Sequence, residues 1–290
     1  MWRRGSKSTR SSAHEPAWSF YVAPARAPLT PSTPITLPST KSISNGLRWW
    51  NRWSAPGAVI RWRKSAPATG RWTARAAWAV RRYNNLPFYL IAVEPEPTYF
   101  HWLRQRLRDN DIDPSQHRLV WAAVTDRCGT IPLYVERPAQ VRDGEPWFGQ
   151  AIAHSPYCEA DTTAREYWGL PLRRHVDGYS SIQVPCLTLE QVLDGRSVVD
   201  LLDMDIQGEE LRAVASSADL LDATVKRLHI GTHSRQIERG LRKLLAKRGW
   251  QLLADYGCLG VRDTPYGPIR FEDGVQTWLN PRLASAAEGS

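Results

Sequence analysis

An apolar run that ends in a cluster of carboxylates constrains this chain more than any other feature. Residues 200–210 read DLLDMDIQGEE, in which hydrophobic residues give way to acids and then to a glycine. A short apolar run bounded by a turn is consistent with a buried strand. In open α/β sheets, ligands bind in the crevice outside the carboxyl ends of such strands. We therefore expect the acids of this segment to lie at a functional site.

Strand and helix patterns alternate along most of the chain. A second apolar run, residues 89–93, ends in Glu94. We predict helices over 70–82, 98–110, 209–221 and 235–248, and strands over 87–93, 118–124, 130–135, 198–205 and 225–231. This alternation predicts a doubly wound, mostly parallel, Rossmann-like α/β sheet with helices on both faces. A hairpin around residues 273–274 is expected to close the chain.

The positive charge of the chain belongs to one end. Residues 1–93 hold 15 lysines and arginines against one acid, whereas residues 94–290 hold 23 basic and 28 acidic residues. A basic, tryptophan-rich segment can bind nucleic acid or an anionic surface, and an acid-poor leader can be a transit peptide. We favour a third interpretation, a disordered extension over residues 1–65, which an upstream reading-frame error or a misassigned start would also give.

The remaining sequence predicts one domain over residues 66–283, long enough to bury a hydrophobic core, followed by a tail over 284–290. Residues 136–183 lack sustained periodicity, and we expect an irregular insertion or lid there. No apolar run is long enough for a membrane helix, and the four cysteines form no CxxC pair. We therefore expect a cytoplasmic protein with reduced thiols and no membrane span.

Three residues are candidates for chemistry. Asp205 and Glu210 follow a predicted strand, where carboxylates can act as a general base or hold a divalent metal. Glu209 and Glu210 also suit the first turn of a helix for electrostatic reasons, which is the simpler explanation for those two. His233 would lie close to Asp205 if strands 198–205 and 225–231 are neighbours, and it could be a base, a metal ligand or a hydrogen-bond donor.

One residue is a candidate for holding a nucleotide. Glu94 lies at the end of a predicted strand and precedes a predicted helix, which is where nucleotide-binding folds place an acid. A carboxylate at that position can accept hydrogen bonds from both hydroxyls of a ribose. An exposed acid at a strand end is the alternative interpretation.

Several ordered motifs together resemble the FkbM-type methyltransferases. They are residues 92–97, 122–126, 200–210, 229–233 and 273–281, and the resemblance covers about residues 70–283. It implies a class I, S-adenosylmethionine-dependent fold and methyl transfer to hydroxyl groups, often on sugars or polyketides. By the same resemblance, Gly70 is the last glycine of the cofactor loop, Glu94 binds the ribose and Ala122 lies near the adenine. Asp205 and Glu210 match the acidic signature of the family.

The glycine loop departs from the family pattern. Where the family has Asp-x-Gly-Ala-Asn-x-Gly, residues 64–70 read KSAPATG. Alanine and proline allow a close backbone approach to a ligand less easily than glycine. Two alternatives to an active O-methyltransferase with a small-molecule or glycan acceptor therefore stay open. One is an inactive relic of the same fold, and the other, which we favour least, is a nucleic-acid-binding protein that acts through its basic end.

Overall fold

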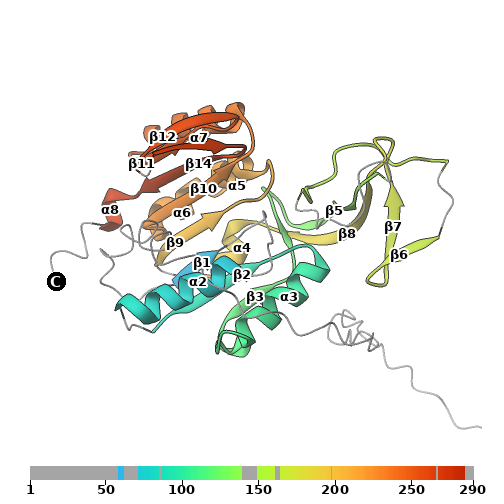
Figure 1. The fold of residues 1–290 in the computed structure, drawn as a ribbon, viewed down its shortest axis with the longest axis horizontal. Coiled ribbons are helices and arrows are strands. Elements are labelled where there is room, and N and C mark those ends of the chain that lie inside the picture. The colour runs from blue at the N-terminus through green and yellow to red at the C-terminus, as the bar shows by residue number, and fades with distance from the viewer. Residues whose placement is uncertain are drawn as a thin grey trace, which may run out of the picture. The chain divides into compact units, whose positions relative to one another are not determined.

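Two β-sheets and a separate hairpin organise the part of the chain that the structure describes. The computed structural model describes residues 58–61, 71–84, 87–138, 149–160, 164–196, 198–265 and 267–284. The larger sheet has seven strands, and a smaller sheet packs beyond one end of it (Figure 1).

The seven-stranded sheet has the order β11-β14-β10-β9-β1-β2-β3. Its strands are β1 (Ala58–Arg61), β2 (Tyr89–Val93), β3 (Arg118–Val120), β9 (Val199–Met204), β10 (Arg227–Thr232), β11 (Gln251–Tyr256) and β14 (Gly274–Leu279). β14 is antiparallel to both of its neighbours, and the other neighbouring pairs are parallel. The strand order reverses direction between β1 and β9, which is where a sheet of this kind opens a ligand crevice. The predicted doubly wound, mostly parallel sheet is confirmed.

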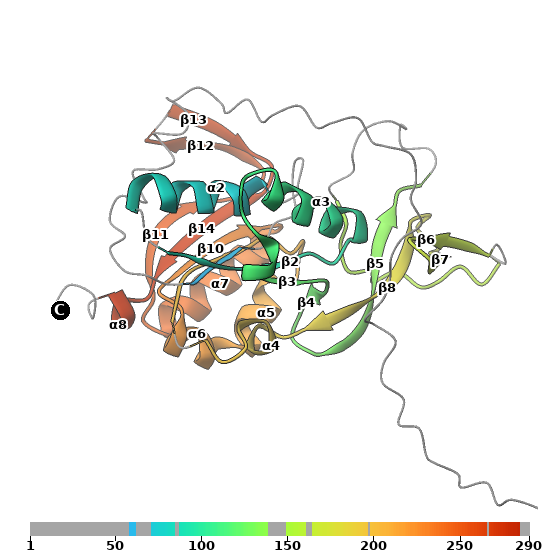
Figure 2. The same cartoon turned by 90° about the horizontal axis from the view of Figure 1, so that it is seen from below.

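Helices cover both faces of this sheet, as Figure 2 shows. Because neighbouring residues of a strand point to opposite faces, Leu90 and Ala92 of β2 pack under α2 and α3, whereas Ile91 and Val93 join the core beneath α4 to α7. The helices are α2 (Arg71–Ala79), α3 (Pro97–Arg108), α4 (Leu189–Leu193), α5 (Glu210–Ser216), α6 (Ala218–Thr224), α7 (Arg235–Lys247) and α8 (Pro281–Ala284). A π-helical turn, Val80–Asn84, extends α2, and a 3₁₀ turn, Pro114–Gln116, precedes β3.

The smaller sheet replaces much of the predicted irregular insertion. Its strands are β4 (Ala123–Val124), β5 (Gly129–Glu136), β6 (Arg165–Tyr167), β7 (Leu170–Arg174) and β8 (Ser180–Leu187). β5 alternates as predicted for an edge strand, with Ile131, Leu133 and Val135 buried against β8. The prediction of an irregular segment over 136–183 is wrong for β6, β7 and the start of β8. β6 has three residues and β7 buries one of its five, so neither shows a regular alternation, and the first three residues of β8 are all buried.

Three predicted elements differ from the observed ones. The predicted strand 118–124 divides into β3 and β4, which belong to different sheets. The predicted helix 209–221 divides at Ser217 into α5 and α6. The hairpin predicted around residues 273–274 is wrong, because β14 inserts between β10 and β11 instead of pairing with β13. The hairpin lies earlier, between β12 (Gly260–Thr264) and β13 (Gly267–Phe271).

The strand β1 lies within residues 1–65, which the sequence assigns to an extension. Its pairing with β2 and β9 places residues 58–61 in the middle of the large sheet, so the α/β fold begins upstream of residue 66. No helix among the described residues combines the length and the apolar character that crossing a membrane requires.

Candidate functional site

The parallel strands carry the predicted site residues to one edge of the large sheet. Glu94 follows β2, Asp205 follows β9 and His233 follows β10. Because these strands run in the same direction, their carboxyl ends share an edge of the sheet. Gly70 and the rest of loop 64–70 lie outside the described residues.

Asp205 is placed by a fully buried strand and a tight turn. All six residues of β9 are buried, and Asp205 comes directly after them. The chain then turns through Gln207 and Gly208, which have φ values of 55° and 109°. Glycine at position 208 adopts this left-handed conformation without the steric cost that a side chain would bring. The turn ends where α5 begins.

Glu210 closes this turn with its side chain. Its carboxylate accepts hydrogen bonds from the backbone N–H of Ile206 at 3.0 Å and of Gly208 at 3.1 Å and 3.2 Å. The side chain of Glu210 has no exposed surface. Glu210 therefore has a specific structural partner in the turn, beyond the general preference of acids for the first turn of a helix.

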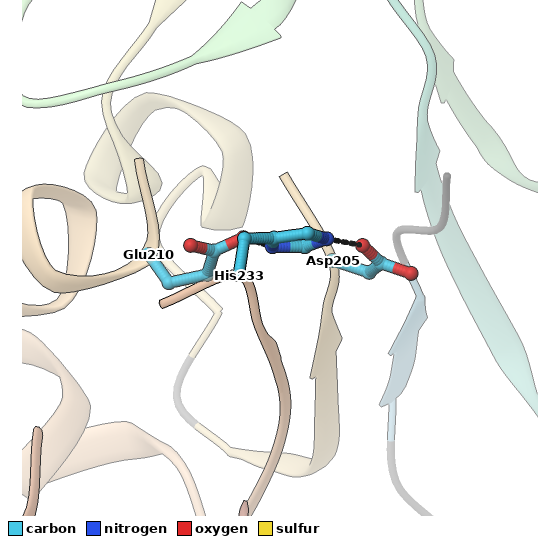
Figure 3. Close-up of side chains that lie close together, drawn as sticks. All are labelled: Asp205, Glu210 and His233. Carbon is cyan, nitrogen blue, oxygen red and sulfur yellow. Dashed lines mark hydrogen bonds and ion pairs between the residues drawn. The ribbon is translucent and has the colours of Figure 1, made fainter. Parts of the chain in front are cut away.

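His233 lies between the two carboxylates (Figure 3). Its Nδ1 is 2.8 Å from Oε1 of Glu210, and its Nε2 is 3.2 Å from Oδ1 of Asp205. The backbone reaches this position because Ser234, the next residue, is the N-cap of α7 and accepts a hydrogen bond from the N–H of Ile237. The predicted proximity of Asp205, Glu210 and His233 is thus observed.

The two carboxylates control the charge of His233. Burial alone would lower the pKa of its imidazole, but the hydrogen bonds to Asp205 and Glu210 outweigh burial and raise the pKa of His233 to about 10. The imidazolium then donates a hydrogen bond from each nitrogen and balances part of the negative charge. In this state His233 has no lone pair with which to accept a proton.

A glycine of β10 makes room for Asp205. A Cβ atom on Gly231 would lie 3.2 Å from Cγ of Asp205, which is closer than most such contacts. A glycine inside a strand often marks a close approach of another group. Gly231 stands in the middle of the motif from His229 to His233, so its place within a predicted strand was a signal that sequence reasoning did not use.

Two of the residues predicted to bind a cofactor, Glu94 and Ala122, lie in neighbouring segments. The backbone N–H of Glu94 donates to the carbonyl of Val120, and the indole of Trp121 donates to the carbonyl of Pro95 at 2.8 Å. Glu94 is 7% exposed and Ala122 is 1% exposed. A buried carboxylate at the carboxyl end of β2 is chemically suited to accept hydrogen bonds from a diol.

The neighbouring acid, Glu96, has a structural role. It is the N-cap of α3 and accepts hydrogen bonds from the N–H of Thr98 at 3.0 Å and of Tyr99 at 2.7 Å. The backbone N–H of Glu96 donates to Oε1 of Glu94 at 3.0 Å. The capping residue thereby fixes the Glu94 carboxylate.

Hydrogen bonds from the end of β6 and from the turn that follows it connect the smaller sheet to the N-terminus of α3. The hydroxyl of Tyr167 donates to Oε1 of Glu96 at 2.7 Å, and the indole of Trp168 donates to the hydroxyl of Thr98 at 2.8 Å. Burial and the Glu96 carboxylate raise the pKa of Tyr167, so its phenol stays a donor. Sequence reasoning missed these residues because their partners are about 70 positions away and no local pattern links them.

Asp205, Glu210 and His233 together offer donor atoms of the kind that bind metal ions. One ligand atom from each lies within 4.8 Å of the others. However, the two carboxylates contact opposite nitrogens of the imidazole, and Glu210 is already engaged by backbone N–H groups. A single ion at Nε2 would therefore contact Asp205 but not Glu210, contrary to the predicted pairing of these two acids.

The topology and this edge of the sheet define the class of the protein. A sheet with one antiparallel strand inserted next to the last parallel one, an acid at the end of β2 and an acidic cluster after β9 are the features of a class I methyltransferase fold. The family model described as the methyltransferase FkbM domain matches residues 65–249. The chain belongs to this family, which confirms the predicted resemblance and the predicted class of enzyme, a methyltransferase.

Individual proteins of known sequence or structure are similar to this chain. A protein of Jannaschia sp. (strain CCS1) that carries a methyltransferase name is 30% identical over 216 residues, which are 74% of this chain and 70% of that protein. The crystal structure of methyltransferase FkbM from Methylobacillus flagellatus KT has a TM-score of 0.43 and 13% identity, over 78% of this chain and 44% of that one. A precorrin-6y C5,15-methyltransferase from Geobacter metallireducens GS-15 has a TM-score of 0.38 and 10% identity, over 86% of this chain and 92% of that one. Since both scores are low, the fold assignment rests on the sheet topology.

Proposed function

We propose that the protein is an S-adenosylmethionine-dependent O-methyltransferase that acts on a hydroxyl group of a sugar, a polysaccharide or another small natural product. The observation that carries the proposal is the placement of a diol-binding acid, Glu94, and a charged cluster, Asp205 with His233, at one edge of one sheet. The first suits a nucleoside and the second suits an acceptor hydroxyl.

Gly70, Glu94 and Ala122 are the residues that would hold the cofactor. Glu94 would accept hydrogen bonds from the ribose hydroxyls, since its carboxylate is buried and fixed by the N–H of Glu96. Ala122 would lie beside the adenine, because it follows β3 next to Glu94. The bound cofactor supplies an electrophilic methyl group on sulfur.

Asp205 would orient the acceptor hydroxyl and take its proton. Its carboxylate is nine-tenths buried and faces His233, which holds it in one orientation from the other side. His233 would act as a positioning residue, because both of its nitrogens donate to carboxylates. General base catalysis by a placed carboxylate contributes about 10²- to 10⁴-fold to a rate, and holding the two reactants in line supplies much of the remainder. The proposal does not require a metal ion.

Charge favours a small acceptor over nucleic acid. Residues 94–290, which hold the site, carry 28 acidic and 23 basic residues. A phosphate backbone is bound mainly through lysine and arginine, so an acidic domain is poorly suited to it. The smaller sheet, docked through Tyr167 on Glu96, would lie beside the bound cofactor.

The test is a methyl-transfer assay on the full-length chain with S-adenosylmethionine and a panel of mono- and oligosaccharides and hydroxylated natural products. We expect S-adenosylhomocysteine to form only with a hydroxylated acceptor, and the product to carry the methyl group on oxygen. Product on nitrogen or carbon would contradict the proposal, as would a folded protein that binds neither the cofactor nor its product.

A further inference from the structure

The helices on one face of the large sheet contain arginines but no acids. α2 contains two arginines, its π-helical turn contains two more and α3 contains three, whereas none of these segments contains Asp or Glu. The two helices lie side by side (Figure 2) and share a core that includes Ala77 of α2 and Leu107 of α3. The helices on the opposite face, α4 to α7, contain five acids and six basic residues. The excess of arginine therefore belongs to one face of the fold.

Three of these arginines are exposed and take part in no ion pair with another residue that the structure describes. They are Arg82, Arg104 and Arg108. Arg81 has a structural role instead, because its guanidinium donates to two backbone carbonyls just after α3, at 3.2 Å and 2.8 Å. Asp109, the first acid after α3, accepts a hydrogen bond from the glutamine side chain of α3 at 2.8 Å. Exposed arginines without acidic partners give a surface a positive potential that attracts anions.

Two aromatic side chains reach the surface beside Arg82. Trp78 is 38% exposed and Tyr83 is 43% exposed. Their rings meet edge-to-face with centroids 5.9 Å apart, and the guanidinium of Arg82 lies 6.0 Å from the centroid of the Tyr83 ring. Tryptophan and tyrosine are enriched where a membrane meets water, because their amphipathic rings sit at the level of the lipid headgroups. An exposed aromatic pair with an arginine beside it is therefore suited to that layer.

We propose that the face formed by α2, its π-helical turn and α3 docks on an anionic membrane surface. Arg82, Arg104 and Arg108 would contact lipid phosphates, and Trp78 and Tyr83 would lie among the headgroups. Basic residues are attracted by the negative surface potential of anionic lipids, and their contributions add. Single-stranded nucleic acid is the less suitable partner, because its bases stack on open aromatic faces, whereas these two rings pack against each other. The inference does not depend on the proposed acceptor or on any step of methyl transfer.

The test is sedimentation of the full-length chain with vesicles of mixed phosphatidylglycerol and phosphatidylcholine, with pure phosphatidylcholine vesicles as the neutral reference. We expect binding to the anionic vesicles only. The binding should weaken as salt is added, because the Debye length falls from about 10 Å at 0.1 M to about 3 Å at 1 M ionic strength. The triple variant Arg82→Gln, Arg104→Gln, Arg108→Gln should lower the affinity by about 100-fold, since each basic residue near an anionic surface contributes about fivefold.

The matched control removes the same number of charges from the opposite face of the sheet. Arg239, Lys243 and Lys247 are exposed on α7, and Lys247 lies in the last turn of its helix, as Arg108 does in α3. The control variant Arg239→Gln, Lys243→Gln, Lys247→Gln should keep the vesicle affinity within about twofold of the wild type, because charges farther than a Debye length from the membrane are screened. Both variants should unfold at the wild-type denaturant midpoint, since all six positions are exposed.

Three results would overturn the inference. One is a folded wild-type protein that does not bind the anionic vesicles, or that binds the neutral vesicles equally well. The second is a vesicle affinity that the α2 and α3 variant lowers no more than the α7 control does. The third is a labelled single-stranded oligonucleotide that binds the wild type more tightly than the vesicles do and loses its affinity in the α2 and α3 variant, which would assign this face to nucleic acid.

Discussion

The acids at the ends of β2 and β9 occupy equivalent places in one sheet but have different surroundings. Glu94 accepts a hydrogen bond from the backbone N–H of Glu96, the other acid in the segment after β2, whose carboxylate is engaged as the N-cap of α3. Asp205 contacts an imidazolium and an amide, and a second carboxylate, that of Glu210, contacts the other nitrogen of the same imidazolium. An acid fixed by backbone groups suits the recognition of ligand hydroxyls, whereas an acid in a charged cluster suits proton movement. The fold thus places one acid at the end of β2 and another at the end of β9, and the groups around each acid determine which chemistry it suits.

The strongest way to break this comparison is Asp205→Asn. The amide keeps the size of the side chain but cannot take a proton, so we expect kcat to fall by about 10²- to 10⁴-fold. The measurement is steady-state methyl transfer at saturating S-adenosylmethionine. An Asp205→Asn enzyme with nearly wild-type kcat would show that Asp205 is not the base.

The next largest effect is expected for Glu94→Ala, which removes the acid at the end of β2. Glu94→Ala removes hydrogen bonds to a charged acceptor, each worth about 1.5–3 kcal/mol, so the KM for S-adenosylmethionine should rise by about 10- to 100-fold. At saturating cofactor, kcat should change much less than in Asp205→Asn. Glu190→Ala, at an exposed site on α4, is the matched control. Equal loss of kcat in the Glu94 and Asp205 variants would remove the distinction between the two sites.

The orientation of the Asp205 carboxylate depends on the space that Gly231 leaves beside it. Gly231→Ala places a methyl group 3.2 Å from Cγ of Asp205, so the carboxylate must shift by a few tenths of an ångström. A small displacement of a catalytic group can cost up to about 10²-fold, and we expect about a tenfold loss of kcat with the KM for cofactor unchanged. A parallel rise in that KM would show that the change spreads to the Glu94 side.

The smallest expected effect concerns the support of Glu94. Tyr167→Phe removes the hydrogen bond to the buried Glu96, and a bond of this kind contributes about 1–3 kcal/mol. We expect a lower unfolding midpoint in denaturant and a rise of a few-fold in the KM for cofactor. Tyr134→Phe in the same sheet loses hydrogen bonds with the exposed Asp177 and with the backbone N–H of Ser155, neither of which reaches Glu96, and should leave the KM for cofactor unchanged. Identical behaviour of the two variants would disprove the link between the smaller sheet and the cofactor side.

Part of the large sheet follows from the sequence, because β2 and β9 come from apolar runs that are followed by recognisable acids. The run before Asp205 and the run before Glu94 both form buried strands. The proximity of His233 to Asp205 also follows, since it requires only that two consecutive parallel strands be neighbours. These predictions use local periodicity and the rule that parallel strands share a functional edge.

The parts that could not be predicted depend on pairing between distant segments. β14 inserts between β10 and β11, which brings Asp273 to His233 across 40 positions of sequence. The hydrogen bond from Tyr167 to Glu96 joins the smaller sheet to the N-terminus of α3, and β6, with three residues, shows no periodicity. Gln207 belongs to the acidic motif, but its contacts with His233 and Asp205 depend on a left-handed turn that its residue type does not demand.

The most direct test of the division between the two acids is calorimetric titration of S-adenosylhomocysteine into the wild-type protein, Glu94→Ala and Asp205→Asn under one set of conditions. We predict saturable binding to the wild type, affinity for Asp205→Asn within about twofold of the wild type, and a loss of about 10-fold or more for Glu94→Ala. If Asp205→Asn loses as much affinity as Glu94→Ala, both acids contribute to cofactor binding, which contradicts the separate roles assigned to them.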